Sequence, residues 1–455
     1  MAEETIELIP EVDVLFYFPY NLGFGTAHVP ANEQEPLFAQ VAAHLSRSYG
    51  SYEWKTSPFP ELTGTILENG ACLRGVPRQA RSESHDFIAK QVAAAGGVLI
   101  GDVKEEVIYL AHGVGCVGIT LRLQFASTAE LAALPTLSLK VINALRTHPS
   151  ELFLRKDFSR FQDAMEKAFS AEGTLYDMWG LLLRGQPRRG FIVCMSQAFV
   201  LRTPAAAVGK DKSAATSLTV PRAELATLLA PLTGFAPEEH QNILPNSVGI
   251  EFCSEGWDGA VALLSDPQWE PWVRFFWMYS TCSWSVLSDL NAYLYSQTRQ
   301  MARSQTVPRE EVRRIMTATR RIQHSLAVLA HEAVPTNLWD TQEQLAMHQG
   351  IFDAWGTQEL LDSIERKVEY LSEQYENLNN LLRDAGQERM DWVMTTFTFL
   401  TFAGVLADCI SSIDFNGQSL TTTLRLSVIF LGTLGVIAIS AGAGYIMHRR
   451  RMLEP

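Results

Sequence analysis

The chain has 455 residues, of which 47% are hydrophobic and 19% are charged, which is enough for roughly two or three domains. Its formal net charge of −13 argues against a nucleic-acid-binding protein, because such proteins usually present a basic surface. The six cysteines lie far apart without a CxxC pair, which predicts free thiols in a reducing compartment.

Residues 1–265 mix strand and helix patterns and predict a cytosolic domain of the α+β or α/β class. Apolar runs bounded by turn residues predict strands at 13–19, 105–125, 190–202 and 247–266. Helices are expected near 33–48, 82–95 and 157–171. The order of the strands does not follow from the sequence, so the two fold classes stay open.

Two motifs in this domain have competing interpretations. Gly113 to Gly118 spell GxGxxG, but the following ITLRLQF reads as a strand, so a glycine-bearing hairpin is favoured over a dinucleotide site. The basic stretch with Arg184, Arg188 and Arg189 is expected to form an exposed turn. Its alternative is a site for a phosphate-bearing ligand, such as a small messenger.

Residues 266–338 predict paired cytosolic helices, and residues 339–390 predict a long stalk helix that begins near Trp339. The stalk carries apolar residues at steps of three and four. They are Leu361, Ile364, Val368, Leu371, Tyr375, Leu378 and Leu382. Such a seam predicts a homo-oligomer, and packing against helices of the same chain is the alternative.

Residues 391–411 and 426–447 are apolar enough to predict two transmembrane helices in the lipid bilayer. The outer loop would be 412–425, with Asp414, Asn416 and Gly417, and a basic tail at 448–455 would follow. Arginines flank the pair on one side, which predicts a multi-pass protein of the inner (plasma) membrane with both termini in the cytosol. A buried hairpin in a soluble fold is the alternative.

One face of the first predicted span is polar. Its members fall within an arc of roughly 140° on a helix. They are Asp391, Thr395, Thr398, Thr401, Val405 and Asp408. If several subunits turn this face inward, it lines a cation pore in which Asp391 and Asp408 bind the metal ion. The alternative is that the threonines bond to their own helix backbone and the aspartates lie at the interfaces.

This plan resembles the CorA-type magnesium/cobalt channel family. The local match is Leu400-Thr401-Phe402-Ala403-Gly404, and MHRRRML is similar to that family's basic tail. The family's Gly-Met-Asn signature is missing, and Ala407-Asp408-Cys409-Ile410 stands in its place. The resemblance implies a funnel of five identical subunits whose first spans line the pore.

The sequence therefore predicts an oligomeric channel or transporter for cations of the magnesium, cobalt, zinc or nickel class, gated by its cytosolic domain. A divalent cation would be the transported or regulatory ion, and neither an enzyme nor another cofactor is expected. The alternative is a CorA-like membrane effector of an antiviral defence system, gated by a nucleotide-like messenger bound to the N-terminal domain.

Overall fold

A computed structural model describes much of the chain, in two compact units. The described residues are 5–22, 31–48, 52–56, 72–78, 82–110, 114–147, 153–171, 196–206, 217–234, 242, 248–256, 259–303, 317, 341–412, 432 and 435. One unit comprises 1–307 with 313–372, and the other comprises 308–312 with 373–455. The domain boundaries predicted from the sequence stay predictions.

The first unit is built on a mixed sheet, with strands in the order β10-β11-β8-β2-β7-β6-β4-β3 and with β5 also paired to β7. A separate pair joins β1 and β9. Of the described pairings, β8 with β11 is parallel and the others are antiparallel. The strands are β1 (Thr5–Leu8), β2 (Glu11–Asn21), β3 (Tyr52–Lys55), β4 (Cys72–Pro77), β5 (Val98–Leu99), β6 (Lys104–Leu110), β7 (Val114–Gln124), β8 (Ser196–Arg202), β9 (Leu218–Pro221), β10 (Ile250–Glu255) and β11 (Ala260–Leu264).

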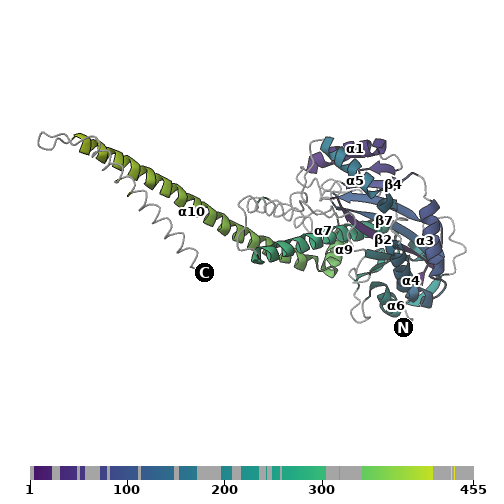
Figure 1. The fold of residues 1–455 in the computed structure, drawn as a ribbon. Helices are drawn as coiled ribbons and strands as arrows, with labels where there is room; N and C mark the ends of the chain where they lie inside the picture. Colours follow the sequence, from purple (N-terminus) through teal and green to yellow (C-terminus); the bar gives the residue numbers. More distant parts are fainter. Residues whose placement is uncertain are drawn as a thin grey trace. The chain divides into compact units, whose positions relative to one another are not determined.

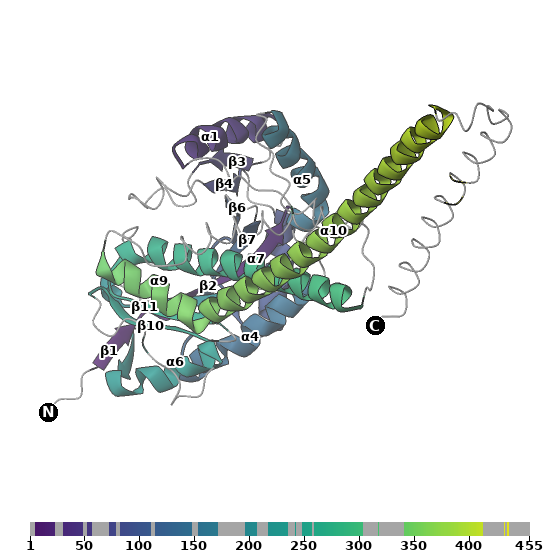
Figure 2. The same cartoon turned by 90° about the vertical axis from the view of Figure 1, so that its left-hand side faces the viewer.

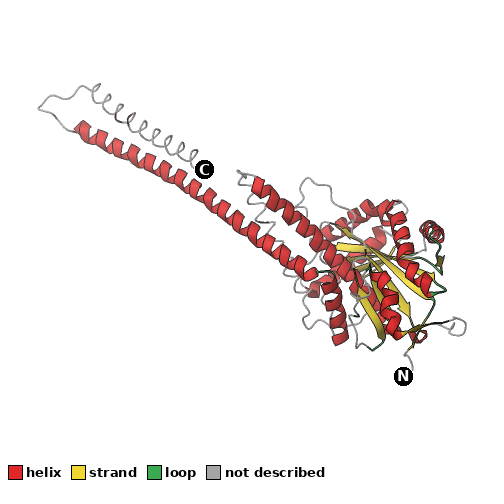
Figure 3. Ribbon diagram, turned by 90° about the horizontal axis from the view of Figure 1, so that it is seen from below, coloured by secondary structure: helices red, strands yellow, loops and turns green. Residues whose placement is uncertain are grey.

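Helices cover this sheet on both faces (Figure 1, Figure 3). They are α1 (Ala31–Ser48), α3 (Ser82–Ala94), α4 (Thr128–Thr147), α5 (Phe153–Ala171), α6 (Leu225–Thr233), α7 (Glu270–Arg303) and α9 (Gln342–Ala354), and α10 (Thr357–Ser412) follows. Helix α7 crosses β2 and β7, and α9 lies next to α7 (Figure 2). The described part of the chain is therefore an α+β structure.

The central strand β2 explains why two separate apolar layers form. Alternate residues of a strand point to opposite faces of the sheet. Val12, Val14 and Phe16 lie in the large core with apolar residues of α1 and α3 to α6. Tyr17 points to the other face, where its hydroxyl donates to the carbonyl oxygen of Arg274 in α7 at 3.1 Å. Because both faces are covered, the strand reads as an apolar run rather than an alternating one.

The GxGxxG motif lies in a hairpin, as the sequence predicted. Strands β6 and β7 pair antiparallel with Tyr109 opposite Gly115. A side chain at Gly115 has no room, because a Cβ there would lie 2.1 Å from the carbonyl oxygen of Ile108 and 2.4 Å from the Tyr20 hydroxyl. This close approach lets the Tyr20 hydroxyl donate to the Ile108 carbonyl at 2.8 Å. The glycine therefore serves packing within the sheet and no helix opens at the motif.

The prediction of one unbroken helix from Trp339 is wrong. Helix α9 ends at Ala354, Trp355 is its C-cap, and α10 begins at Thr357. Gly356 between them has φ of 57°, a left-handed conformation that favours glycine and ends the first helix. The seam residues of α10 from Leu361 to Tyr375 are buried within the single chain. The side chains of Leu378 and Leu382 lie outside the described residues.

The predicted membrane architecture is contradicted. Among the described residues, no helix combines the length and the apolar character that a bilayer crossing requires. Residues 391–411 form the end of α10. Almost all of 426–447 lies outside the described residues. This finding corrects three predictions: two C-terminal transmembrane helices, membrane-transport character and a multi-pass location in the inner membrane.

We expect Gly115→Ala to destabilise the first unit by about 2 kcal/mol or more, because the added methyl group collides with backbone that cannot move away. Urea denaturation followed by circular dichroism measures the change. Val98→Ala is the control, because Val98 is an exposed residue of the same sheet. Equal stability of the Gly115 variant and the wild type would contradict this account of the hairpin.

Candidate functional site

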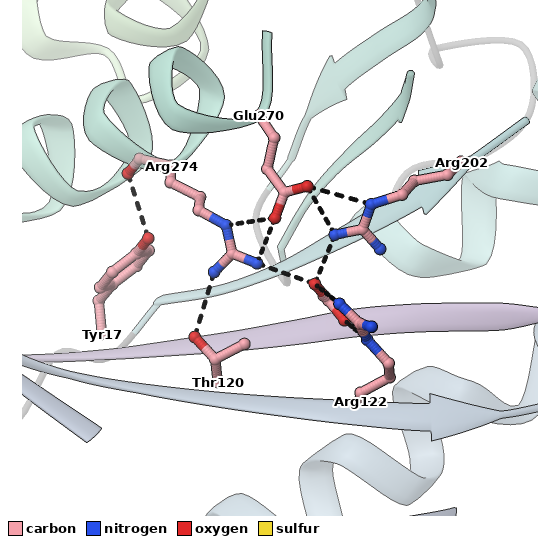
Figure 4. A network of polar contacts seen from close by, with 7 residues as sticks. Tyr17, Thr120, Arg122, Arg202, Glu270 and Arg274 are labelled. Carbon is pink, nitrogen blue, oxygen red and sulfur yellow. Dashed lines mark hydrogen bonds and ion pairs between the residues drawn. The ribbon is translucent and has the colours of Figure 1, made fainter. Parts of the chain in front are cut away.

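A cluster of charged residues holds α7 against the sheet (Figure 4). Asp13, on β2, is only 2% exposed. Arg122 of β7 donates to its two carboxylate oxygens at 2.8 and 3.3 Å. Arg202 of β8 donates to Oδ2 of Asp13 at 2.5 Å, and Arg274 of α7 donates to the same oxygen at 2.9 Å. One buried carboxylate thus joins three guanidinium groups from three elements.

Glu270 completes the cluster from the first turn of α7. Its Oε2 accepts two bonds from Arg202, at 3.0 and 2.7 Å. Its Oε1 accepts two bonds from Arg274, at 2.9 and 2.7 Å. Arg274 also donates to the hydroxyl of Thr120 on β7 at 3.2 Å. Bidentate contacts of this kind fix direction as well as distance, so the start of α7 has a defined position on the sheet.

The cluster stays charged over the whole physiological pH range. Burial alone would raise the pKa of Asp13, but the hydrogen bond from Arg122 and the charges of Arg202 and Arg274 outweigh it and lower the pKa to about 2. Burial would likewise raise the pKa of Glu270, and the two neighbouring arginines lower it instead. Groups with such values do not exchange protons near neutral pH, so the cluster is a structural clamp and not an acid–base site.

A second polar centre lies where β10, α7 and α9 meet. Glu255, the last residue of β10, is buried, and its Oε1 accepts a hydrogen bond from the indole N–H of Trp355. Trp277 of α7 lies close enough for its indole N–H to lower the pKa of this carboxyl. The ring of Trp284 stands edge to face on that of Trp355, with 5.6 Å between centroids. A single carboxyl group is thus enclosed by indole rings.

His348 of α9 lies in an aromatic cluster of the same α7–α9 layer. Its ring centroid is 4.2 Å from that of Phe352 and 6.0 Å from that of Phe276. The ring centroid of Tyr279 lies 6.4 Å from that of His348. The imidazole is almost fully buried, at 1% exposure. It therefore packs as an aromatic ring in its neutral form.

Burial shifts these two groups in opposite directions. It raises the pKa of Glu255 from 4.5 to about 8, with the indole of Trp355 offsetting only a part. It lowers the pKa of His348 from 6.5 to about 4. Both groups are therefore neutral at pH 7 in the folded protein. Glu255 is the one of the two that can lose its proton within the physiological range.

The predicted pore residues lie in α10. Asp391, Thr395, Thr398, Thr401 and Val405 are all exposed in the single chain. Each of the three threonine hydroxyls donates to the carbonyl oxygen four residues earlier, at 2.7 to 2.8 Å. This is the local arrangement expected of threonines in any helix. Their role in lining a pore stays a prediction.

Other predicted site residues lie outside the described part of the chain. The backbone of Asp408 belongs to α10, but its side chain is not described. Both backbone and side chain lie outside the described residues for Asp414, Asn416 and Gly417, and likewise for Arg184, Arg188 and Arg189. Within the described residues, no three His, Cys, Asp or Glu side chains gather in a group that could hold a metal ion. Metal binding by Asp391 and Asp408 stays a prediction.

Comparison with known proteins adds no relative. The chain matches no protein-family model, no curated protein and no solved structure. The resemblance to CorA-type channels therefore rests on the sequence alone.

Sequence reasoning missed both polar centres, although each leaves a signal. Asp13 interrupts the apolar run VDVLFYF, and a charge inside a buried strand requires a partner. Glu255 similarly ends the strand IEFCSE. The partners could not be found in this way, because Arg274 is 261 residues from Asp13 and Trp355 is 100 residues from Glu255.

Asp13→Asn should destabilise the protein by about 3–5 kcal/mol at pH 7, because it leaves guanidinium groups without their buried counter-charge. The folded pKa of about 2 lies below the ordinary 3.8, so the contribution of the carboxylate is present above pH 3.8 and is lost as the pH falls through 2. The difference between variant and wild type should shrink by about 2 kcal/mol over that window. Urea titrations across this pH range test it, with the exposed Glu7→Gln as the neutral control.

His348→Phe should remove one acid-dependent loss of stability. The folded pKa of about 4 lies below the ordinary 6.5, so neutral His348 stabilises the fold above pH 6.5 and this contribution disappears as the pH falls to 4. The wild type should lose about 3 kcal/mol relative to the variant between these two values. Denaturant midpoints at half-unit steps measure the difference, with His44→Asn as the control. Parallel curves for the variant and the wild type would contradict the assignment.

Proposed function

We propose that this protein is a regulatory assembly protein whose copies associate through α10. In this proposal, the α+β unit is the regulatory part and the C-terminal half of α10 is the contact surface. The proposal keeps the homo-oligomer predicted from the sequence. It assigns the association to a different part of the helix from the heptad seam.

The observation that carries the proposal is an uncovered apolar stripe on α10. Met390, Val393, Met394, Phe397 and Val405 are each more than half exposed. With 100° of rotation per residue, these positions fall within an arc of roughly 120°, together with Thr401. This is the width of the apolar face by which an amphipathic helix packs on a partner. We call these six residues the α10 stripe.

A second copy of the chain is the partner that fits the α10 stripe best. No charged residue occurs between Asp391 and Asp408, so the surface offers no charge pattern for an acidic or a basic partner. The steps from Met390 to Met394, Phe397 and Thr401 are four, three and four residues, the spacing with which helices of equal sequence interlock. Fully burying one such apolar side chain is worth about 1.5–3 kcal/mol. Five of them supply a substantial driving force for association.

The heptad seam is not free for this purpose. Leu361, Ile364, Val368 and Leu371 are at most 2% exposed within the single chain. A hydrogen bond from Lys367 to the Asn291 side chain of α7 lies next to this seam. The seam therefore fixes the start of α10 within the first unit. Association is left to the α10 stripe.

Cation conduction and messenger binding stay predictions from the resemblance. The number of subunits, five by that resemblance, also stays a prediction. The described residues test neither cation conduction nor messenger binding, and they do not give the number of subunits.

Phe397→Asp should shift the protein from oligomer to monomer, because it places a charge in the middle of the α10 stripe. A loss of at least tenfold in association constant is expected, equivalent to about 1.4 kcal/mol. Size-exclusion chromatography with light scattering, over a hundredfold range of protein concentration, measures it. Met394→Asp should act in the same direction.

Thr395→Asp is the matched control, because it adds the same charge to an exposed residue that lies outside the arc of the α10 stripe. It should leave the association constant unchanged within about twofold. A wild-type protein that is monomeric at every concentration would contradict the proposal. So would a wild-type protein that floats with lipid vesicles but does not associate with itself.

A further inference from the structure

We propose that Glu255 and Trp355 form a proton-dependent latch, in which the protonated carboxyl group holds the α9–α10 junction against β10 and loss of the proton releases it. The parts of the latch are the carboxyl group of Glu255, the indole of Trp355 and the turn at Gly356. All three belong to the first unit.

The latch lies at the junction where α9 ends and α10 begins. Trp355 is the C-cap of α9, and the next residue, Gly356, carries the left-handed turn into α10. The indole N–H reaches across to Oε1 of Glu255, 100 positions earlier in the chain. The hydrogen bond thus ties the direction in which α10 starts to the edge strand β10.

The surroundings of Glu255 favour its neutral form. Trp277 is 2% exposed and, together with Trp355, presents an apolar ring beside the carboxyl group. The indole N–H groups of Trp355 and Trp277 favour the carboxylate, but they offset only a part of the cost of burying it without a cation.

Among the described residues, the following titratable groups on the neighbouring elements do not provide that cation. Cys253 on β10 has a pKa that burial raises far above neutral. His348 on α9 is neutral near pH 7, since burial lowers its pKa to about 4. Tyr279 on α7 and Glu359 at the start of α10 carry no positive charge in any state.

The direction of the pH effect follows from the shift. Burial raises the pKa of Glu255 to about 8 in the closed junction, against an ordinary 4.5 when the junction opens. The closed form therefore binds the proton more tightly, and a rise in pH favours the open form. Between pH 6.5 and 8 the ratio of open to closed form should increase about fifteenfold in total. The rise is close to tenfold per pH unit at first and smaller near pH 8, where the closed form itself begins to ionise. His348 in its buried place is neutral throughout this window, since burial lowers its pKa to about 4.

The consequence for assembly rests on the proposed function, because α10 also carries the α10 stripe. The latch itself does not depend on that proposal. Its opening is a local event of the α9–α10 junction, and it can be measured whether or not the copies associate. The two ideas can therefore fail separately.

Hydrogen–deuterium exchange of the full-length protein tests the latch. Protection factors are measured for peptides that span residues 351–360, at pH 6.5, 7, 7.5 and 8, after correction for intrinsic exchange. In the wild type the protection should fall about fifteenfold over this range. In Glu255→Gln, which keeps the shape and the acceptor oxygen but cannot ionise, protection should stay constant. In Trp355→Phe it should already be low at pH 6.5.

Glu359→Gln is the control for a nearby carboxylate, and it should keep the pH dependence of the wild type. Peptides from β2 and β7 should keep constant protection in every variant, which separates local opening from global unfolding. If Glu255→Gln does not fold, the pH profile of the wild-type peptides alone decides. A flat wild-type profile, or the same fall in β2 and β7, would overturn the proposal. A Glu255→Gln variant that retains the pH dependence would overturn it as well.

Discussion

The buried carboxylate of Asp13 is the point on which the arrangement of the first unit depends. A charge at this depth is tolerated because guanidinium groups from β7, β8 and α7 converge on it. The same contacts determine where α7 starts and in which direction it crosses the sheet. Glu270 strengthens this, since it binds two of the three arginines from within α7. Without Asp13, the three arginines would lose the carboxylate that joins them. Helix α7 would keep the contacts of Glu270 with Arg202, of Arg274 with Thr120 and of the Arg274 carbonyl with Tyr17.

Helix α7 thus carries two buried polar centres of different character. The cluster around Asp13 joins five strongly ionised groups and keeps its charges between acid and alkaline conditions. The centre around Glu255 has one carboxyl group among indoles, and its protonation changes near neutral pH. The difference follows from the neighbours, because arginine stabilises a carboxylate and an apolar ring does not. One centre fixes the helix, and the other can respond to conditions.

Helix α10 has two apolar faces, which lie in different parts of its length. Near its start, the apolar seam is covered by the chain itself. From Met390 onward, large apolar side chains are exposed instead. This division explains why the heptad pattern left the partner of the seam open. The periodicity shows that a face is apolar, but it does not tell whether the partner belongs to the same chain or to another.

The sequence by itself determined the main elements of the first unit, because period and composition are local properties. The strands at 13–19 and 105–125 and the hairpin at the GxGxxG motif lie where the patterns placed them, and α7 lies within the helical region predicted at 266–338. It went wrong where long-range context decides. Gly356 ended a helix that was expected to continue, and the apolar 391–411 proved to be the end of α10 without the character of a membrane span among the described residues. Only the tertiary structure brought Asp13 to Arg274 and Glu255 to Trp355, because a buried charge requires a partner but leaves its position along the chain unspecified.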